Sequence, residues 1–300
     1  MSLPAAAIPS TIPSVNQAAA EESPQPPRPE YDNEVAHTIW ELERGVRRGY
    51  GGEATRLALL KAHVEQMRLF ETRLDIPEAG RSFLRLQDRS APSVLVLAGE
   101  EQDCSGLQTL GSRLHRAGFG VLASSLAYRS LDRPGLSPFY WQTCLDEAEN
   151  RYDMLNHYAT RIAVIGFGLG AAIALHLATR KRVNAVVGVF PILDAKLGAT
   201  DQLRTMMRNL APRLFKTPPK WTMQRRLATT GVQKATSQFA APILVLVEER
   251  SQKGDAGRSQ RFVKQLAARG GAQLQSVPAG AADALPDATI DTLLAFLKQR

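Results

Sequence analysis

The sequence predicts an α/β protein with a mostly parallel central sheet, helices on both faces, a helical basic cap insertion and N-terminal helices. Short apolar runs alternate with amphipathic stretches from about residue 81 to the C-terminus. Several of these runs are apolar throughout, which is typical of strands that are buried on both faces of a parallel sheet. In addition, a glycine-rich turn joins one apolar run directly to an alanine-rich helix.

Length and composition agree with one such domain and additional segments. The chain has 300 residues, of which 44% are hydrophobic and 22% are charged, and its net charge is +8. The two cysteines, Cys104 and Cys144, predict free thiols rather than a disulfide framework. No apolar run is long enough to span a bilayer, and the first residues lack the pattern of a signal peptide. We therefore expect a cytoplasmic protein, either free, at a membrane surface or within a larger assembly.

The sequence divides into three parts. Residues 1–33 are rich in proline and alanine and are predicted to form a disordered arm. Residues 34–80 are predicted to form two helices, which a break at Gly49, Gly51 and Gly52 separates. The apolar faces of these helices pack either on the same chain or on a second copy, and the sequence leaves this choice open. Residues 81–300 form the predicted α/β domain.

Apolar periodicity places the elements of this domain. Strands are expected at residues 82–86, 93–98, 120–124, 161–165, 183–190, 242–247 and 273–277. Helices are expected at residues 107–117, 141–158, 171–179, 259–269 and 290–298.

The alternation of strands and helices lapses at residues 196–234, where a basic insertion is predicted. This stretch carries nine cations against Asp201 alone, an excess as large as the net charge of the whole chain. We expect a mainly helical cap over the carboxyl edge of the sheet. Arginine pairs with carboxylates and phosphates and packs on apolar surfaces, so the cap is a candidate binding surface; a solvated basic face is the alternative. The candidate residues are Arg204, Arg208, Arg213, Lys216, Lys220, Trp221, Arg225 and Arg226.

The most specific local motif is GFGLG at residues 166–170, between a buried run and a helix. Such a turn serves either as the elbow of a G-x-S-x-G hydrolase motif or as a dinucleotide-binding G-x-G-x-x-G/A loop. Gly166, Gly168 and Ala171 satisfy the second pattern. However, three expected strands precede this one, and the next strand ends without the acid that binds the ribose. The sequence therefore favours an elbow.

Six pieces of the sequence follow one another in a recognisable order over nearly three quarters of the chain. They are SVLVLAGE, GLQTLGSRLHRAGFGVLASSL, RIAVIGFGLGAAIALHLATR, VNAVVGVFPILD, APILVLVEE and LQSVPAGAADAL. In this order they resemble the α/β-hydrolase superfamily, in particular small carboxylesterases and monoacylglycerol lipases. The resemblance implies an elbow and pocket around Gly99, Gly166, Gly168, Leu169 and Gly170.

The sequence departs from the catalytic positions that this resemblance implies. The nucleophile position holds Gly168, which has no side chain, and the usual His-Gly after the first central strand is Ala98-Gly99. The family order is nucleophile, acid, histidine, yet no histidine follows His176. The acids available after the run at residues 243–247 are Glu248, Glu249 and Asp255. We therefore expect a catalytically degenerate member without a catalytic residue.

Three functions remain as hypotheses. The main one is a non-catalytic binding or scaffolding subunit, which contacts a protein partner or a second copy through the basic cap and the N-terminal helices. The alternative is a binding protein or sensor for a small acyl or anionic ligand in the vestigial pocket, and a third is an ester hydrolase with unrecognised catalytic residues. No HExxH, CxxC or comparable ligand pattern occurs, so no metal or cofactor is expected. The basic cap is compatible with an anionic lipid surface, whereas nucleic acid is disfavoured because no nucleic-acid motif occurs.

Overall fold

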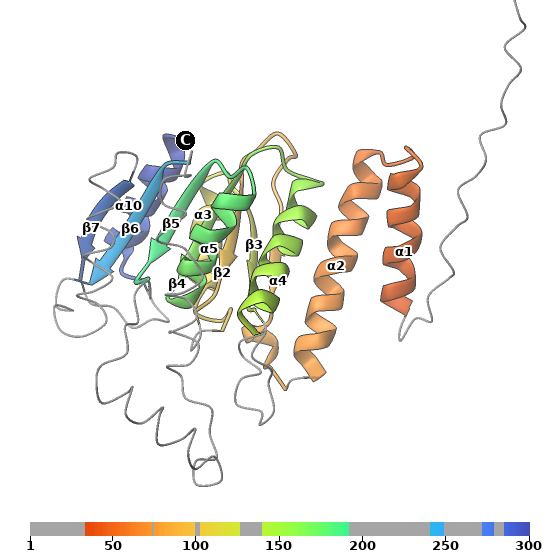
Figure 1. Ribbon diagram of the computed structural model, residues 1–300, viewed down its shortest axis with the longest axis horizontal. Helices are drawn as coiled ribbons and strands as arrows, with labels where there is room; N and C mark the ends of the chain where they lie inside the picture. Colours follow the sequence, from red (N-terminus) through yellow and green to blue (C-terminus); the bar gives the residue numbers. More distant parts are fainter. Residues whose placement is uncertain are drawn as a thin grey trace, which may run out of the picture.

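The computed structural model of the chain describes residues 34–73, 75–99, 103–126, 140–191, 241–248, 272–278 and 285–300. The helices are α1 (Glu34–Arg47), α2 (Glu53–Arg73), the short 3₁₀ helix η1 (Glu78–Gly80), α3 (Gln108–Arg116), α4 (Tyr140–Asn156), α5 (Leu169–Arg180) and α10 (Asp287–Lys298). The strands are β1 (Phe83–Arg85), β2 (Ser93–Leu97), β3 (Gly120–Ser124), β4 (Ile162–Phe167), β5 (Ala185–Val189), β6 (Ile243–Glu248) and β7 (Ala272–Val277). Figure 1 shows a central sheet between layers of helices.

The sheet confirms the predicted fold class. Its strand order is β1-β3-β2-β4-β5-β6-β7. Among the strands that the structure describes, only β1 runs antiparallel to its neighbour, β3, and the other five pairs are parallel. Gly166 of β4 pairs with Leu97 of β2 on one side and with Gly188 of β5 on the other. The carboxyl ends of the three central strands therefore meet at one edge, directly where the GFGLG turn follows β4.

Alternating side chains of the strands form two cores, one on each face of the sheet. Leu95 and Leu97 of β2 pack in the core that α4 and α5 cover. Val94 and Val96 of the same strand pack in the opposite core, which α3 and α10 cover. All five residues of β2 are buried. This burial on both faces explains why the central strands read as continuous apolar runs rather than as alternating ones.

The two N-terminal helices form an antiparallel pair at one end of the molecule. Helix α2 lies between α1 and the α/β domain, where it contacts α4 and β1 (Figure 1). Leu60, Val64 and Met67 of α2 belong to the same core as α4 and α5. The sequence left open whether these helices pack on the same chain or on a second copy. In the structure, α2 packs within the chain. Whether α1 also contacts a second copy stays a prediction.

Each of the seven predicted strands has its counterpart in the sheet. β3 has the predicted bounds, and each of the other six is shifted by one or two residues at one end or both. Helix α5 begins at Leu169, two residues before its predicted start, because Gly168 alone makes the turn from β4. Helix α10 begins at Asp287, directly after Pro286, whose fixed φ suits a helix start. The predicted helix at 259–269 and the insertion at 196–234 lie outside the described residues. No helix in the described part of the chain is long and apolar enough to cross a membrane.

Candidate functional site

The turn between β4 and α5 consists of one residue, Gly168. Its backbone has φ 50° and ψ −111°, a conformation that residues with a side chain adopt only under strain. The N–H of Gly168 donates a hydrogen bond to the carbonyl of Val189 at 2.9 Å, which fixes the turn to the end of β5. Strained turns held in this way are typical of positions where a fold presents a functional group.

The two flanking glycines are required by close packing. A Cβ on Gly170 would lie 2.6 Å from the carbonyl oxygen of Leu97 and 2.7 Å from that of Ala98. A Cβ on Gly166 would collide with the carbonyl oxygen of Gly170. Helix α5 therefore starts so close to β2 and β4 that no side chain fits at either position. This is the packing that a G-x-S-x-G elbow needs, because it lets a strand turn at once into a helix.

The same packing brings the loop after β2 to the elbow. Gly99 follows β2 and is buried, and the N–H of Ala98 donates to the carbonyl of Ser124 at 3.1 Å. Gly170 lies against the carbonyls of Leu97 and Ala98 on the neighbouring strand. The structure thus places the predicted elbow residues at one edge of the sheet. It gives them no side chain at the centre, because residue 168 is glycine.

The polar groups that α5 contributes to this edge are the backbone N–H groups of its first turn. No side chain caps the helix, and no acidic residue lies in its first turn. The N–H groups of a first helical turn point out of the helix, and the helix dipole favours negative charge there. At the elbow, Leu169 and the residues after it are therefore suited to stabilise a carbonyl oxygen that becomes an oxyanion.

His176 lies on the same helix but does not belong to the elbow. It is eight residues from Gly168, which corresponds to about 12 Å along a helix, and it is 9% exposed. Burial lowers the pKa of His176 from its ordinary value of 6.5, the nearby Arg180 lowers it further, and Glu149 opposes both. These surroundings favour a neutral imidazole within the core.

Sequence reasoning missed a buried cluster beside this edge, centred on Glu71 of α2. One oxygen of its carboxylate accepts hydrogen bonds from the hydroxyls of Ser82 at 2.6 Å and Ser125 at 2.7 Å, and the other accepts from the N–H of Ser82 at 2.7 Å. Arg151 of α4 donates to the hydroxyl of Ser124 at 3.3 Å. Burial lowers the pKa of Arg151, which the carboxylates of Glu147 and Glu71 oppose.

The signal for this cluster was present in the sequence. Glu71 follows Met67 by four residues and Val64 by seven, so it falls on the apolar stripe of α2. A carboxylate on such a stripe needs buried hydrogen-bond donors, because an unpaired buried charge is costly. The cluster ties α2 to the end of β3, next to the loop that carries Gly99.

Several predicted site residues lie outside the described part of the chain. They are the basic candidates Arg204, Arg208, Arg213, Lys216, Lys220, Trp221, Arg225 and Arg226, and the acids Glu249 and Asp255. Glu248 ends β6, so its backbone stands at the carboxyl edge of the sheet. Among the described residues, no group of three or more His, Cys, Asp or Glu side chains could hold a metal ion.

Comparison with known proteins agrees with this fold. The sequence model of the dienelactone hydrolase family matches residues 84–280. No curated protein matches the chain. Among solved structures, the metagenome-derived lipolytic enzymes LipS and LipT give a TM-score of 0.55 at 14% identity, covering 75% of this chain and 100% of theirs.

Two further solved structures share this fold. Est1E from Butyrivibrio proteoclasticus gives a TM-score of 0.51 at 14% identity over 73% of this chain and 92% of its own, and it is also known with ferulic acid bound. The carboxylesterase from Nitrososphaera gargenis gives 0.52 at 14% identity over 72% of this chain and 94% of its own. At such low identity these structures show the shared fold alone.

The family match corrects the main functional hypothesis. A non-catalytic binding or scaffolding subunit was expected because residue 168 is glycine and no histidine follows His176. That expectation is wrong: the match to a hydrolase family, together with a fold shared with esterases, points to an esterase or hydrolase. The expectation gave more weight to the residue types at two positions than to the third hypothesis, an ester hydrolase with unrecognised catalytic residues.

Proposed function

Since this chain belongs to the dienelactone hydrolase family, we propose that it binds a small carboxylic ester at the carboxyl edge of its sheet and hydrolyses it with water. The ester carbonyl lies against the first turn of α5, beside Gly168 and Gly99. One observation carries this proposal: the backbone keeps the strained elbow, with φ 50° at Gly168, although no side chain is presented there.

Hydrolysis at this site requires water as the nucleophile, because glycine offers no atom that could be acylated. We place this water where a nucleophilic side chain would stand on residue 168, between the elbow and the ester carbonyl. A general base removes a proton as the water oxygen attacks, and the carbonyl oxygen becomes an oxyanion that the N–H groups of α5 stabilise. Collapse of this intermediate expels the alcohol, which takes up the proton, and leaves the carboxylic acid.

We propose Glu248 as the general base. It is the last residue of β6, and its backbone stands at the same edge as the elbow, with β5 between β6 and β4. The α/β-hydrolase resemblance also implies an acid after the apolar run at residues 243–247, and Glu248 follows that run directly. Parallel strands present their carboxyl ends to one crevice, which is where open α/β sheets bind their ligands.

The test is hydrolysis of a panel of short esters, including p-nitrophenyl acetate, p-nitrophenyl butyrate and methyl ferulate, by the purified chain. We expect release of acid above the buffer rate, and we expect Glu248→Gln to lower kcat at least tenfold. Glu53→Gln is the matched control, because Glu53 is an exposed carboxylate at the start of α2. Equal rates for the protein and for buffer across the panel would contradict the proposal.

A second function is favoured by the same glycine. Without a nucleophilic side chain at residue 168, an acyl compound at the elbow is not attacked by the protein itself. We therefore propose as the second candidate a binding protein for small acyl or anionic ligands. Saturable binding of the acid or ester without any turnover supports this second candidate over the first.

We also propose a cytoplasmic location, which the two cysteines support. Cys104 and Cys144 are both buried and unbridged, which agrees with a reducing compartment. Fractionation of cells that express the full chain is the corresponding test, and recovery in a membrane or secreted fraction would contradict it.

A further inference from the structure

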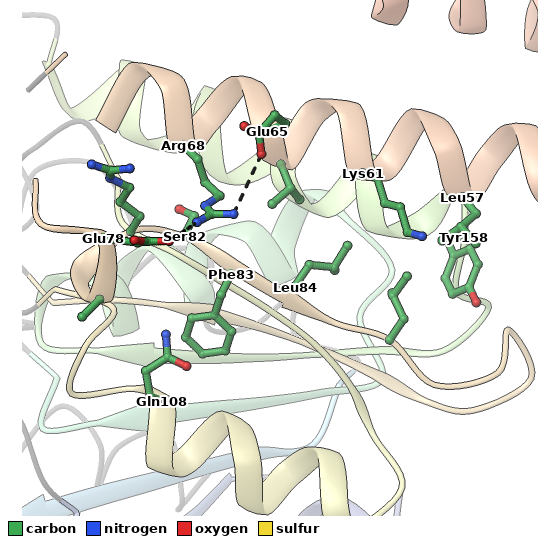
Figure 2. Close-up of a pocket in the computed structure, with 14 residues that line it drawn as sticks. Leu57, Lys61, Glu65, Arg68, Glu78, Ser82, Phe83, Leu84, Gln108 and Tyr158 are labelled. Carbon is green, nitrogen blue, oxygen red and sulfur yellow. Dashed lines mark hydrogen bonds and ion pairs between the residues drawn. The ribbon is translucent and has the colours of Figure 1, made fainter. Parts of the chain in front are cut away.

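A groove lies away from the elbow, between α2, the edge strand β1 and the start of α3 (Figure 2). Its volume is about 760 Å³, within the range of small-molecule sites. The family match begins at residue 84, so α2 precedes the matched region. The helical wall of this groove is therefore not part of the matched hydrolase unit.

The walls of the groove are mainly apolar on the side of β1. Leu57, Val64, Leu84 and Leu86 line it, and Tyr158 lies at one end, close to Leu57 (Figure 2). Leu57, Leu84 and Leu86 are only partly buried. These side chains pack against one of the two cores yet keep apolar surface in contact with solvent. A ligand with a hydrocarbon chain would remove that surface from water, which is the favourable contribution to binding.

Lys61, Arg68 and Arg81 are the cations that line the groove, and they differ in their contacts. Arg68 pairs with Glu78 at 3.3 Å and with Glu65 at 3.9 Å. Arg81 donates from Nε to the carbonyl of Ile76 at 3.0 Å. Within the described part of the chain Lys61 has no ion-pair partner, and Figure 2 shows it reaching over the groove between Leu84 and Tyr158.

We propose that this groove binds a medium-chain carboxylate, with its carboxylate at Lys61 and its alkyl chain along Leu84 and Leu86. A carboxylate carries one negative charge, which one lysine ammonium matches. A phosphate monoester carries nearly two negative charges, which a single lysine ammonium does not balance. The groove is separate from the elbow. Binding of a carboxylate in the groove can therefore be tested independently of ester hydrolysis.

The test is calorimetric titration of the full chain with decanoate below the concentration at which it forms micelles. Butyrate and decanol are the comparison ligands, because one lacks the long chain and the other lacks the charge. We expect decanoate to bind more tightly than either, since each added buried methylene strengthens binding. We also expect higher salt to weaken decanoate binding, because the ion pair at Lys61 is exposed.

Two variants locate the site. Lys61→Gln should weaken decanoate binding roughly fivefold and leave decanol binding unchanged, as expected for loss of one exposed charge-assisted hydrogen bond. Lys61→Arg should retain decanoate binding, and Lys298→Gln on α10 is the control for the loss of a lysine elsewhere. Equal decanoate affinities for the wild-type chain and Lys61→Gln would overturn the proposal, as would tighter binding of a decyl phosphate than of decanoate.

Discussion

The hydroxyl of Ser125 donates a hydrogen bond to Glu71 at 2.7 Å, and so joins the end of β3 to a helix that precedes it by 54 residues. Ser125 follows β3, next to the strand whose end carries Gly99. Glu71 belongs to α2, which lies before the region matched by the hydrolase family. The bond therefore connects the added N-terminal helices with the edge of the sheet at which we place the ester.

Replacing Glu71 should destabilise the protein strongly. Glu71→Ala removes three hydrogen bonds and leaves the buried donors of Ser82 and Ser125 without their acceptor. Breaking such a buried charged cluster costs about 3–5 kcal/mol in the free energy of unfolding, which urea denaturation measures. Glu65→Ala on the same helix is the control, because Glu65 is exposed and forms only a 3.9 Å ion pair. A loss in Glu71→Ala no larger than in this control would contradict the role of the cluster.

The close packing at the elbow predicts opposite effects for two glycine substitutions. Gly170→Ala would bring a Cβ within 2.7 Å of two backbone carbonyl oxygens of β2 and its following residue. Because backbone cannot move aside easily, we expect a loss of about 3 kcal/mol or more in the free energy of unfolding. Gly45→Ala in α1 meets no atom within 4 Å and should stabilise by roughly 0.5–1 kcal/mol, through better helix propensity. Equal effects of the two changes on the melting temperature would be incompatible with this packing.

Two histidines with lowered pKa values, His63 and His176, predict that stability falls in mild acid. Burial lowers the pKa values of His63 and His176 from 6.5; for His63, the carboxylate of Glu43 at 3.6 Å opposes this effect. The unfolded chain therefore takes up protons at a higher pH than the folded chain. Their contribution to stability is complete above about pH 6.5 and is lost as the pH falls through the lower folded values. His176→Gln should flatten the dependence of the unfolding free energy on pH between 7.5 and 5, and an unchanged dependence would refute this assignment.

Much of the fold could be predicted from the sequence because the central strands are buried on both faces. A continuously apolar run such as residues 94–98 leaves little choice of structure, and β2 covers residues 93–97. The GFGLG turn was equally informative, since close packing forbids side chains at Gly166 and Gly170. Periodicity could not show which elements α2 contacts, because this helix packs against α1 on one side and against the α/β domain on the other. The groove beside β1 was therefore not foreseen. Glu71 could have been singled out, because it is a carboxylate in line with Val64 and Met67.

The functional prediction failed for a different reason. It rested on residue types at Gly168 and after His176, which describe one catalytic arrangement, whereas the family match rests on the whole stretch from residue 84 to 280. A sequence shows which side chain is missing at a position. It does not show which other group could act at that position. We propose that water is the nucleophile there.

The most direct test of an ester site at the elbow is Gly168→Cys, with alkylation by iodoacetamide measured in the presence and absence of a ketone analogue of the best ester. The two natural cysteines are buried and give little background. The substitution costs about 1–3 kcal/mol in backbone strain, so the melting temperature of the variant is measured alongside. We predict that the introduced thiol is alkylated rapidly and that the analogue slows its alkylation at least tenfold. A folded variant whose thiol is unreactive, or reacts equally fast with and without the analogue, would contradict the proposed site.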